Sequence, residues 1–145
     1  MTKDDVLAFL RTQKWAVEAS VSARGGAQAA LIGIAVTDDL ELVFDTIETS
    51  RKAVNMQSNP KVAFVIGGWT AGDERTVQFE GLADFPQGED LERAKGVYYA
   101  AFPDGPSRLS WPGLAYVRVR PLWARFSDFT AVPPVVQEFE FGPAG

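Results

Sequence analysis

The sequence predicts a mainly β fold, a six- to seven-stranded antiparallel β-barrel with peripheral helices. Short stretches of alternating apolar and polar residues recur along the chain, and a period of two is typical of strands that bury one face. Turn residues separate the early stretches closely, which favours antiparallel pairing of strands that follow one another. Closure into a barrel is an economical way to hide strand edges, and a β-sandwich is the alternative that the pattern leaves open.

The first part of the chain combines one helix with several short strands. A helix is predicted over residues 3–13, because Thr2 and Asp5 form a capping-box pattern ahead of apolar residues at helical spacing. A strand with one buried face follows, in which Trp15, Val17, Ala19 and Val21 alternate with Ala16, Glu18, Ser20 and Ser22. Two further strands are expected at residues 28–36 and 41–45.

The second part repeats this mixture. A short helix is expected from Thr49 or Ser50 to Ser58, where Asn59-Pro60 stops it. The further predictions are strands at 61–68 and 75–84, a helix at 88–102, and strands at 114–119 and 123–129 on either side of Pro121. Residues 130–145 form either an extra strand or an ordered arm. The whole chain, 1–145, is expected to be one domain.

Two residue types are missing from the 145-residue chain, histidine and cysteine. Their absence excludes thiolate nucleophiles, Fe–S clusters, the usual zinc sites, His-ligated haem and Ser-His-Asp triads. Redox or group-transfer chemistry therefore calls for a bound cofactor, and no spacing of carboxylates suggests a metal site.

Charge and hydropathy limit the partners and the compartment. The formal net charge of −5 argues against general nucleic-acid binding. No apolar run approaches the ~20 residues that span a bilayer, and the N-terminus lacks a signal-peptide pattern. We therefore expect a cytoplasmic protein that binds neither nucleic acid nor membrane.

The segment from Phe44 to Lys52 carries the features of an anion site. It ends a strand and opens a helix, where backbone N–H groups are unpaired and the helix dipole is positive. Ser50 adds a hydroxyl group, and Arg51 and Lys52 add cations that suit a phosphate group. An ordinary helix start with solvated cations is the alternative, but two cations there oppose the dipole, which favours the phosphate site.

The chain resembles, from about Leu7 to Phe129, the FMN-binding split barrels related to pyridoxamine 5′-phosphate oxidase. The residues that carry the resemblance are Phe44-x-Thr46, Ser50-Arg51-Lys52, Asn59-Pro60-x-Val62, Glu74-Arg75-x-Val77 and Gly81. Their order and spacing together, not any single motif, make the likeness specific. The resemblance implies a six-stranded split barrel, a homodimer, and one FMN in each of two grooves at the dimer interface.

The resemblance also implies roles for particular residues. Ser50, Arg51 and Lys52 would bind the FMN phosphate, with Thr46 near the phosphate or ribityl chain. The strand 30–33 would lie along the isoalloxazine ring, whose approach small residues permit. Separately from the resemblance, Trp111 is an aromatic residue in the loop 109–113, where it would either cover the flavin ring across the dimer interface or pack on the mouth of the barrel. The candidate cofactor-binding residues are Ala30, Leu31, Ile32, Gly33, Asp45, Thr46, Ser50, Arg51, Lys52, Thr76, Gln78 and Trp111.

The sequence departs from the true oxidases around the ring. Where they carry an Arg and a Lys at the two ends of the ring-binding strand, this chain has Ala30 and Ala35. Where they have a flavin-contacting Gln after Glu-Arg, this chain has Thr76, and Gln78 lies two residues along on the same strand face. FMN binding therefore follows from the resemblance more directly than oxidation of pyridoxamine phosphate does.

The function expected from the sequence is that of an FMN-dependent oxidoreductase acting on a small-molecule substrate that the sequence does not identify. The flavin would supply the reactive group, and no catalytic side chain is assigned. The alternatives are a flavin-binding stress or sensor protein without turnover, and a split barrel that uses the deazaflavin F420. A haem-handling member is the least favoured, because the chain has no histidine to serve as an axial ligand.

Overall fold

The computed structural model describes residues 1–142 and contains eight strands, three α-helices and one 3₁₀ helix. The helices are α1 (Lys3–Arg11), α2 (Arg51–Ser58), α3 (Gly88–Ala101) and the 3₁₀ helix η1 (Gly105–Ser110). The strands are β1 (Trp15–Val21), β2 (Ala27–Gly33), β3 (Ala35–Val36), β4 (Leu42–Ile47), β5 (Lys61–Gly67), β6 (Arg75–Asp84), β7 (Leu114–Asp128) and β8 (Val135–Glu140). Within this part of the chain, no helix has the length and apolar character needed to cross a membrane.

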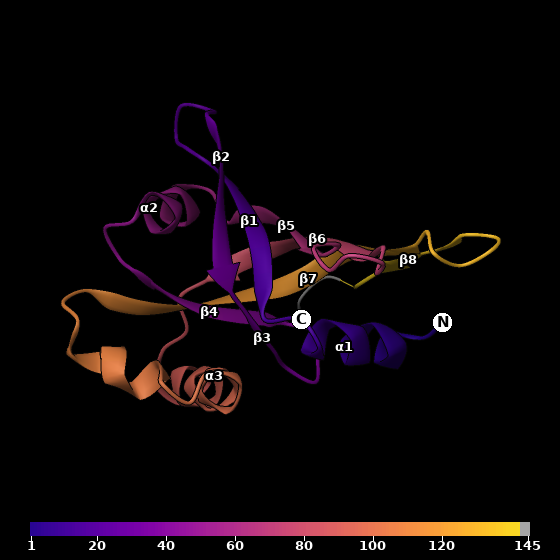
Figure 1. Ribbon diagram of the computed structural model, residues 1–145. Coiled ribbons are helices and arrows are strands. Elements are labelled where there is room, and N and C mark those ends of the chain that lie inside the picture. The colour runs from indigo at the N-terminus through magenta and orange to yellow at the C-terminus, as the bar shows by residue number, and fades with distance from the viewer. Residues whose placement is uncertain (143–145) are drawn as a thin grey trace.

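The strands form one antiparallel sheet in the order β2-β1-β5-β6-β7-β4-β3, with β8 added to β7. The two ends of this order, β2 and β3, are separated in the chain only by Ile34, so the sheet has to curl. In Figure 1 the β1–β2 hairpin rises above the rest of the sheet with α2 beside it, and α3 lies below. The mainly β, split-barrel architecture predicted from the sequence is confirmed.

The sheet curls around β7, and here the prediction of two strands on either side of Pro121 was wrong. β7 runs unbroken over 15 residues and pairs with β6 from Arg118 to Asp128. Its other edge pairs first with β4 and then, beyond Pro121, with β8. The register with β6 shifts between Glu80 and Gly81, which face Trp123 and Pro121. This bulge tolerates the proline, which has no N–H to donate to a ladder.

Gly81 is required at the bulge by close packing. A Cβ there would lie 2.5 Å from the backbone oxygen of Arg120 and 2.6 Å from Cγ1 of Val119. Both distances are far below van der Waals contact, and one of the two atoms belongs to backbone that cannot move aside. β6 and β7 therefore approach closely only because this residue has no side chain.

Three further boundaries differ from the sequence expectations. The strand expected over 28–36 is interrupted at Ile34, whose N–H donates to the carbonyl oxygen of Lys14 at 3.0 Å. β4 extends to Ile47, two residues beyond the expected end, so that Thr46 lies in the strand. The tail is an extra strand over β8, and the last residues of the predicted arm, 143–145, lie outside the described residues.

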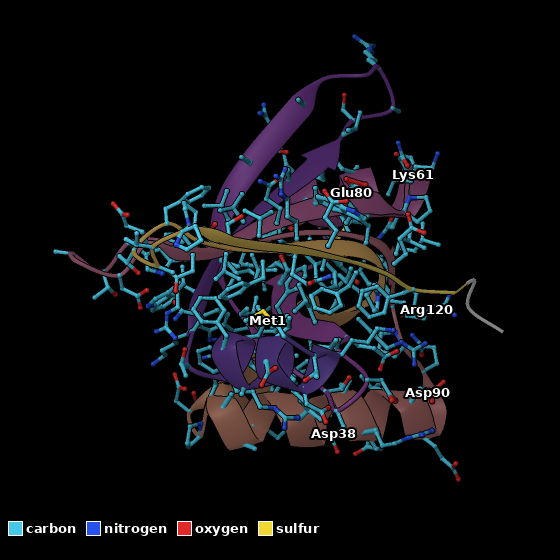
Figure 2. All side chains as sticks on the ribbon, turned by 90° about the vertical axis from the view of Figure 1, so that its right-hand side faces the viewer. Met1, Asp38, Lys61, Glu80, Asp90 and Arg120 are labelled. Atoms are coloured by element: carbon cyan, nitrogen blue, oxygen red, sulfur yellow. The ribbon has the colours of Figure 1, made fainter. Side chains whose placement is uncertain are left out.

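The main core fills the inside of the curled sheet, and α1 closes it at one end. Val6, Phe9 and Leu10 of α1 pack there with inward-facing residues of nearly every strand, among them Phe44, Phe64, Ile66, Phe79 and Val117. A second cluster lies beneath α3, where Ala94, Tyr98 and Phe102 meet Ala35, Val43 and Tyr116. Figure 2 shows α1 and α3 on one side of the sheet, with Glu80 on the opposite side.

β1 presents its faces in an unexpected way. The residues with little exposure are Ala16, Glu18 and Ser20, whereas Trp15 is exposed and Val17 and Ala19 are half-buried. The apolar side of this amphipathic strand therefore points away from the core. The same surface continues onto β2 and β5, and we call Val17, Ala19, Leu31, Ala63 and Val65 together the outer apolar face. Leu31 is 65% exposed and Val65 44% exposed on it.

The inward side of β1 is polar, and α2 satisfies part of it. Nδ2 of Asn55 on α2 donates to Oγ of Ser20 and to Oε1 of Gln28, both at 3.0 Å. Glu18, by contrast, is fully buried, and neither of its carboxylate oxygens has a hydrogen-bond partner among the described residues. Burial raises the pKa of Glu18, and the Ser20 hydroxyl and the Lys52 charge offset only part of that effect.

Replacement of Glu18 by Gln should stabilise the protein at neutral pH. The pKa of Glu18 is raised above 4.5 in the folded state. The contribution of protonated Glu18 to the free energy of unfolding is therefore complete below pH 4.5, and it is lost as the pH rises through the pKa of the folded state. We expect Glu18→Gln to raise the free energy of unfolding at pH 7.5 by ~1–3 kcal/mol, because the neutral amide removes the desolvation cost of a buried charge. Urea unfolding at pH 7.5 and pH 5 measures it.

The matched control is Glu80→Gln, which changes an exposed carboxylate on the opposite face of the sheet and should leave stability almost unchanged. The advantage of Glu18→Gln should shrink at pH 5. An equal gain at both pH values, or no gain, would contradict the assignment of an unpartnered buried carboxylate.

Candidate functional site

A hollow of about 350 Å³ lies between β2, the end of β4, the start of α2 and the segment that follows η1. Eight of the twelve candidate residues line it, namely Leu31, Ile32, Gly33, Asp45, Thr46, Ser50, Lys52 and Trp111. The remaining lining residues are Ile47 and Leu114. Three segments distant in sequence, 31–33, 45–52 and 111–114, thus meet around one surface, and we call this the first hollow.

One end of the first hollow is a ready anion site. Ser50 caps α2, where its Oγ accepts from the N–H of Ala53 at 3.3 Å, and this Oγ lies 2.8 Å from Oγ1 of Thr46. The first turn of α2 contains no acidic residue, so nothing in it offsets the positive end of the helix dipole. The free N–H groups of this turn and two hydroxyls suit the oxygens of a phosphate group.

The two cations beside this helix start are placed differently. Lys52 is half-buried and lines the first hollow, whereas Arg51 is exposed and does not line it. Neither cation forms an ion pair with a residue in the described part of the chain. Lys52 is therefore the cation that the fold aims at the anion site.

The β2 side of the first hollow is apolar and flat. Leu31 offers an exposed side chain, while Ala30, the strand neighbour opposite Glu18, does not line the hollow. The small size of Gly33 has a cause inside the chain, because a Cβ there would lie 2.7 Å from Cζ of Phe102. The glycine thus makes room for an aromatic ring from α3's end, in addition to leaving the strand surface open.

Asp45 lines the first hollow, but its carboxylate is hydrogen-bonded to other side chains of the same chain. Nε of Arg108 donates to Oδ2 of Asp45 at 2.7 Å, and the hydroxyl of Tyr98 donates to Oδ1 at 3.1 Å. Arg108 also donates to Tyr98 Oη at 3.0 Å and to Asp104 Oδ2 at 3.0 Å. Burial, with the adjacent Asp45 charge, raises the pKa of Tyr98 to about 12, so the phenol stays neutral.

This polar cluster anchors η1 to β4 and was not foreseen from the sequence. Arg108 lies 63 positions from Asp45, in a segment without periodicity, so no local pattern indicates the pair. Charged side chains that pair when only 15% and 16% exposed lose less to solvent screening than a surface salt bridge does. The pair therefore fixes the position of η1 against β4, and with it the starting point of the residues that follow η1.

Trp111 follows η1 and stands at the rim of the first hollow, where its side chain is 52% exposed. The chain turns back at Gly113, whose φ of 75° disfavours other residues and whose carbonyl oxygen accepts from the N–H of Glu48 at 2.8 Å. Arg108 and Gly113 thus hold the segment on both sides of Trp111.

Two candidate residues lie elsewhere. Thr76 and Gln78 line a separate hollow of about 300 Å³ on the outer side of the sheet, together with four residues of the outer apolar face, Val17, Ala19, Ala63 and Val65. From Leu31 on β2 to Gln78 on β6 is three strand spacings, roughly 14 Å. Within one chain, these two residues do not join the other candidates around the first hollow.

The comparisons with known proteins agree with this architecture. A sequence profile of the family described as pyridoxamine 5′-phosphate oxidase matches residues 2–128. No curated protein matches the chain.

Three solved structures illustrate the likeness. A heme-binding protein from Mycobacterium smegmatis superposes with a TM-score of 0.82 at 12% identity, covering 97% of this chain but only 58% of its own. A putative pyridoxamine 5′-phosphate oxidase from Listeria innocua has a TM-score of 0.70 at 21% identity, covering 86% and 96%. A pyridoxamine 5′-phosphate oxidase-related, FMN-binding protein from Nostoc punctiforme has a TM-score of 0.69 at 13% identity, covering 97% and 95%.

At these identities the structures show the shared fold, and their ligands remain properties of those proteins. The profile match spans most of the sequence and covers the strand, helix and turn residues that build the first hollow. The chain therefore belongs to the pyridoxamine 5′-phosphate oxidase family of split barrels.

Proposed function

We propose that this chain binds FMN in the first hollow and acts as an FMN-dependent oxidoreductase on a small-molecule substrate. The observation that carries the proposal is the anion site at the start of α2. There, the Thr46–Ser50 hydroxyl pair, the N–H groups at the start of α2 and Lys52, which has no ion-pair partner among the described residues, lie at one end of a hollow whose β2 side is apolar. A phosphate joined to a planar ring system matches both ends of that arrangement.

Each part of the hollow would have a distinct task. Ser50, Thr46 and Lys52 would hold the phosphate group, and the strand β2 would support one face of the ring. Trp111 would shield the ring from water, from the position that the Arg108 anchor gives it. Bound flavin would supply the hydride- and electron-transfer chemistry, while the chain binds and orients it.

The outer apolar face supports a homodimer. Val17, Leu31 and Val65 occupy neighbouring positions on three adjacent strands. Leu31 and Val65 are 65% and 44% exposed. An apolar sheet face of this kind is costly in water, and a second copy of the chain would cover it with the same residues. The inverted orientation of β1 has a physical reason in such an assembly, because its apolar side would face the partner.

The split of the candidate residues points the same way. Thr76 and Gln78 border the outer apolar face, whereas the phosphate site lies beyond β2. In a dimer that packs through this face, residues of one copy would approach the flavin that the other copy holds. The flavin would then lie at the interface, with contributions from both chains.

Haem is an alternative ligand to consider, because the structurally similar protein from Mycobacterium smegmatis is a heme-binding protein. The chain has neither histidine nor cysteine, so two usual axial ligands are missing, and the polar end of the first hollow is built for one compact anion. The deazaflavin F420 shares the ribityl phosphate of FMN. A flavin-binding sensor would use the same site without turnover.

Loss of the Lys52 cation should weaken FMN binding selectively. A charge-assisted hydrogen bond contributes ~1.5–3 kcal/mol, so Lys52→Ala should raise the FMN dissociation constant roughly 10- to 100-fold. Flavin fluorescence titration measures this. Riboflavin, which lacks the phosphate, should bind the wild type and the variant equally weakly, and Lys61→Ala on β5 is the matched control with unchanged affinity.

The same titration decides among the ligands. Wild-type protein that binds hemin or F420 but not FMN would overturn the assignment, and an unchanged dissociation constant in Lys52→Ala would misplace the phosphate. Oxidation of NADH or NADPH by the FMN-loaded protein, measured at 340 nm, separates an oxidoreductase from a sensor.

The dimer should depend on the centre of the outer apolar face. Light scattering at micromolar concentration should give twice the mass of the chain, and Val65→Lys should give a monomer, because the substitution introduces a charge at the interface. Val132→Lys, which changes a valine that is 97% exposed, should leave the dimer intact. A monomeric wild type would remove this part of the proposal.

The Arg108 anchor should affect cofactor binding from outside the phosphate site. Arg108→Ala leaves Asp45, which is 15% exposed, with only the Tyr98 hydroxyl as partner, which should cost ~1.5–3 kcal/mol of stability and release the segment with Trp111. We expect weaker FMN binding and an increased dissociation rate in stopped-flow fluorescence. Arg93→Ala removes an exposed cation that pairs with Asp90, and this control should change neither quantity measurably.

A further inference from the structure

A second hollow, of about 520 Å³, lies beside the cofactor site described above and shares only Trp111 and Leu114 with it. It lies between the end of α2, the start of α3 and the segment between η1 and β7. In Figure 1 that segment runs between α2 above and α3 below. A volume of this size is within the range of small-molecule sites. We call it the second hollow.

Large apolar side chains form part of the wall of the second hollow, which polar residues complete. Phe85, Pro86 and Leu91 lie on the α3 side, and Leu109 and Trp111 lie on the other side. Leu109 is 53% exposed although Arg108, its neighbour in the chain, is tied to Asp45. Two large apolar side chains are thus held in water by an anchored segment, which is a cost that an apolar ligand would relieve.

One cation, Lys95, and one carboxylate, Glu48, line the second hollow. Lys95 is 24% exposed, and its Nζ lies 6.0 Å from the ring centroid of Tyr116 and 3.4 Å from Oε1 of Glu92. Glu92 is itself 72% exposed, so this ion pair is weak. Glu48 borders Gly113, three residues before Tyr116, which is roughly 10 Å along the chain.

The two hollows are neighbours. Trp111 and Leu114 line both, so Trp111 forms a wall between the proposed flavin site and the second hollow. An occupant of the second hollow would therefore contact the same indole that shields the flavin.

We infer that the second hollow binds an aromatic molecule with one acidic group, its ring between Leu91 and Trp111 and its anion at Lys95. The acidic group belongs beside Lys95, the one cation among the residues that line the second hollow, because Glu48 in the same lining repels an anion. Binding itself is independent of the flavin. The further statement that this molecule is the substrate of the oxidoreductase rests on the proposed function.

The test uses 1-anilinonaphthalene-8-sulfonate, a ring system with one sulfonate group, and measures its fluorescence with the protein before any flavin is added. The wild type should bind one probe per chain. Lys95→Ala should raise the dissociation constant roughly tenfold, because a charge-assisted contact is lost, and Lys95→Arg should restore most of the affinity. Lys61→Ala is the matched control and should bind as the wild type does.

The outer apolar face is the competing place for such a probe, and Val65→Ser tests it. Loss of probe binding in Val65→Ser with unchanged binding in Lys95→Ala would overturn the inference. So would an equal loss of FMN affinity in Lys95→Ala, since the two hollows would then be one site. A wild type that binds the probe through Lys95 but binds no FMN would refute the proposed function and leave the ligand site standing.

Discussion

The curl of the sheet around β7 is the constraint on which the rest of the structure depends. β7 is shared by β6 along one edge and by β4 and then β8 along the other, so it has to bend where its partner changes. Gly81 and Pro121 allow the bend, one by having no Cβ and the other by needing no hydrogen bond. The bend brings β4 and its Thr46 round toward β2, and the first hollow exists because those two strands meet near the start of α2.

The two faces of the curled sheet are covered by different elements, and this difference connects the fold to the proposed function. Inside, α1 and the apolar side chains of the seven strands β1 to β7 form the core. Outside, α3 covers β3, β4 and the first half of β7, while the outer apolar face on β1, β2 and β5 has no such cover in the described chain. The burial of Glu18 is a consequence of the same division of the faces. Its strand turns an apolar side outward, and the inward positions are left to polar residues that α2 satisfies only in part.

A single buried ion pair links the two proposed ligand sites. Arg108 and Asp45 connect η1 to β4, and the residues just beyond Arg108 form the wall between the hollows. Asp45, which lines the first hollow, therefore also has a structural role as the partner of Arg108. It acts on the sites through the position of Trp111, and it does so as a charge that is largely removed from water, where pairing with Arg108 is required.

Much of the fold could be predicted because period-two alternation, capping residues and turn residues act locally. They placed α1, α2 and α3, and most strands within two residues of their observed ends. Thr46, Ser50 and Lys52 could be found together, since eight consecutive positions contain them. The interruption between β2 and β3 at Ile34 and the continuity of β7 through Pro121 could not be predicted, because each depends on which strand lies alongside.

The sequence by itself determined the class of the fold, the residues of the anion site and the exclusion of chemistry that needs histidine or cysteine. Only the tertiary structure decided which side of β1 is buried, that Arg51 turns away while Lys52 faces the hollow, and that Asp45 serves Arg108. Thr76 and Gln78 likewise separate from the other candidates only in three dimensions. The reason is the same in each case. Local patterns reflect interactions within a few residues, whereas facing, pairing and separation are set by contacts between segments that the curled sheet brings together.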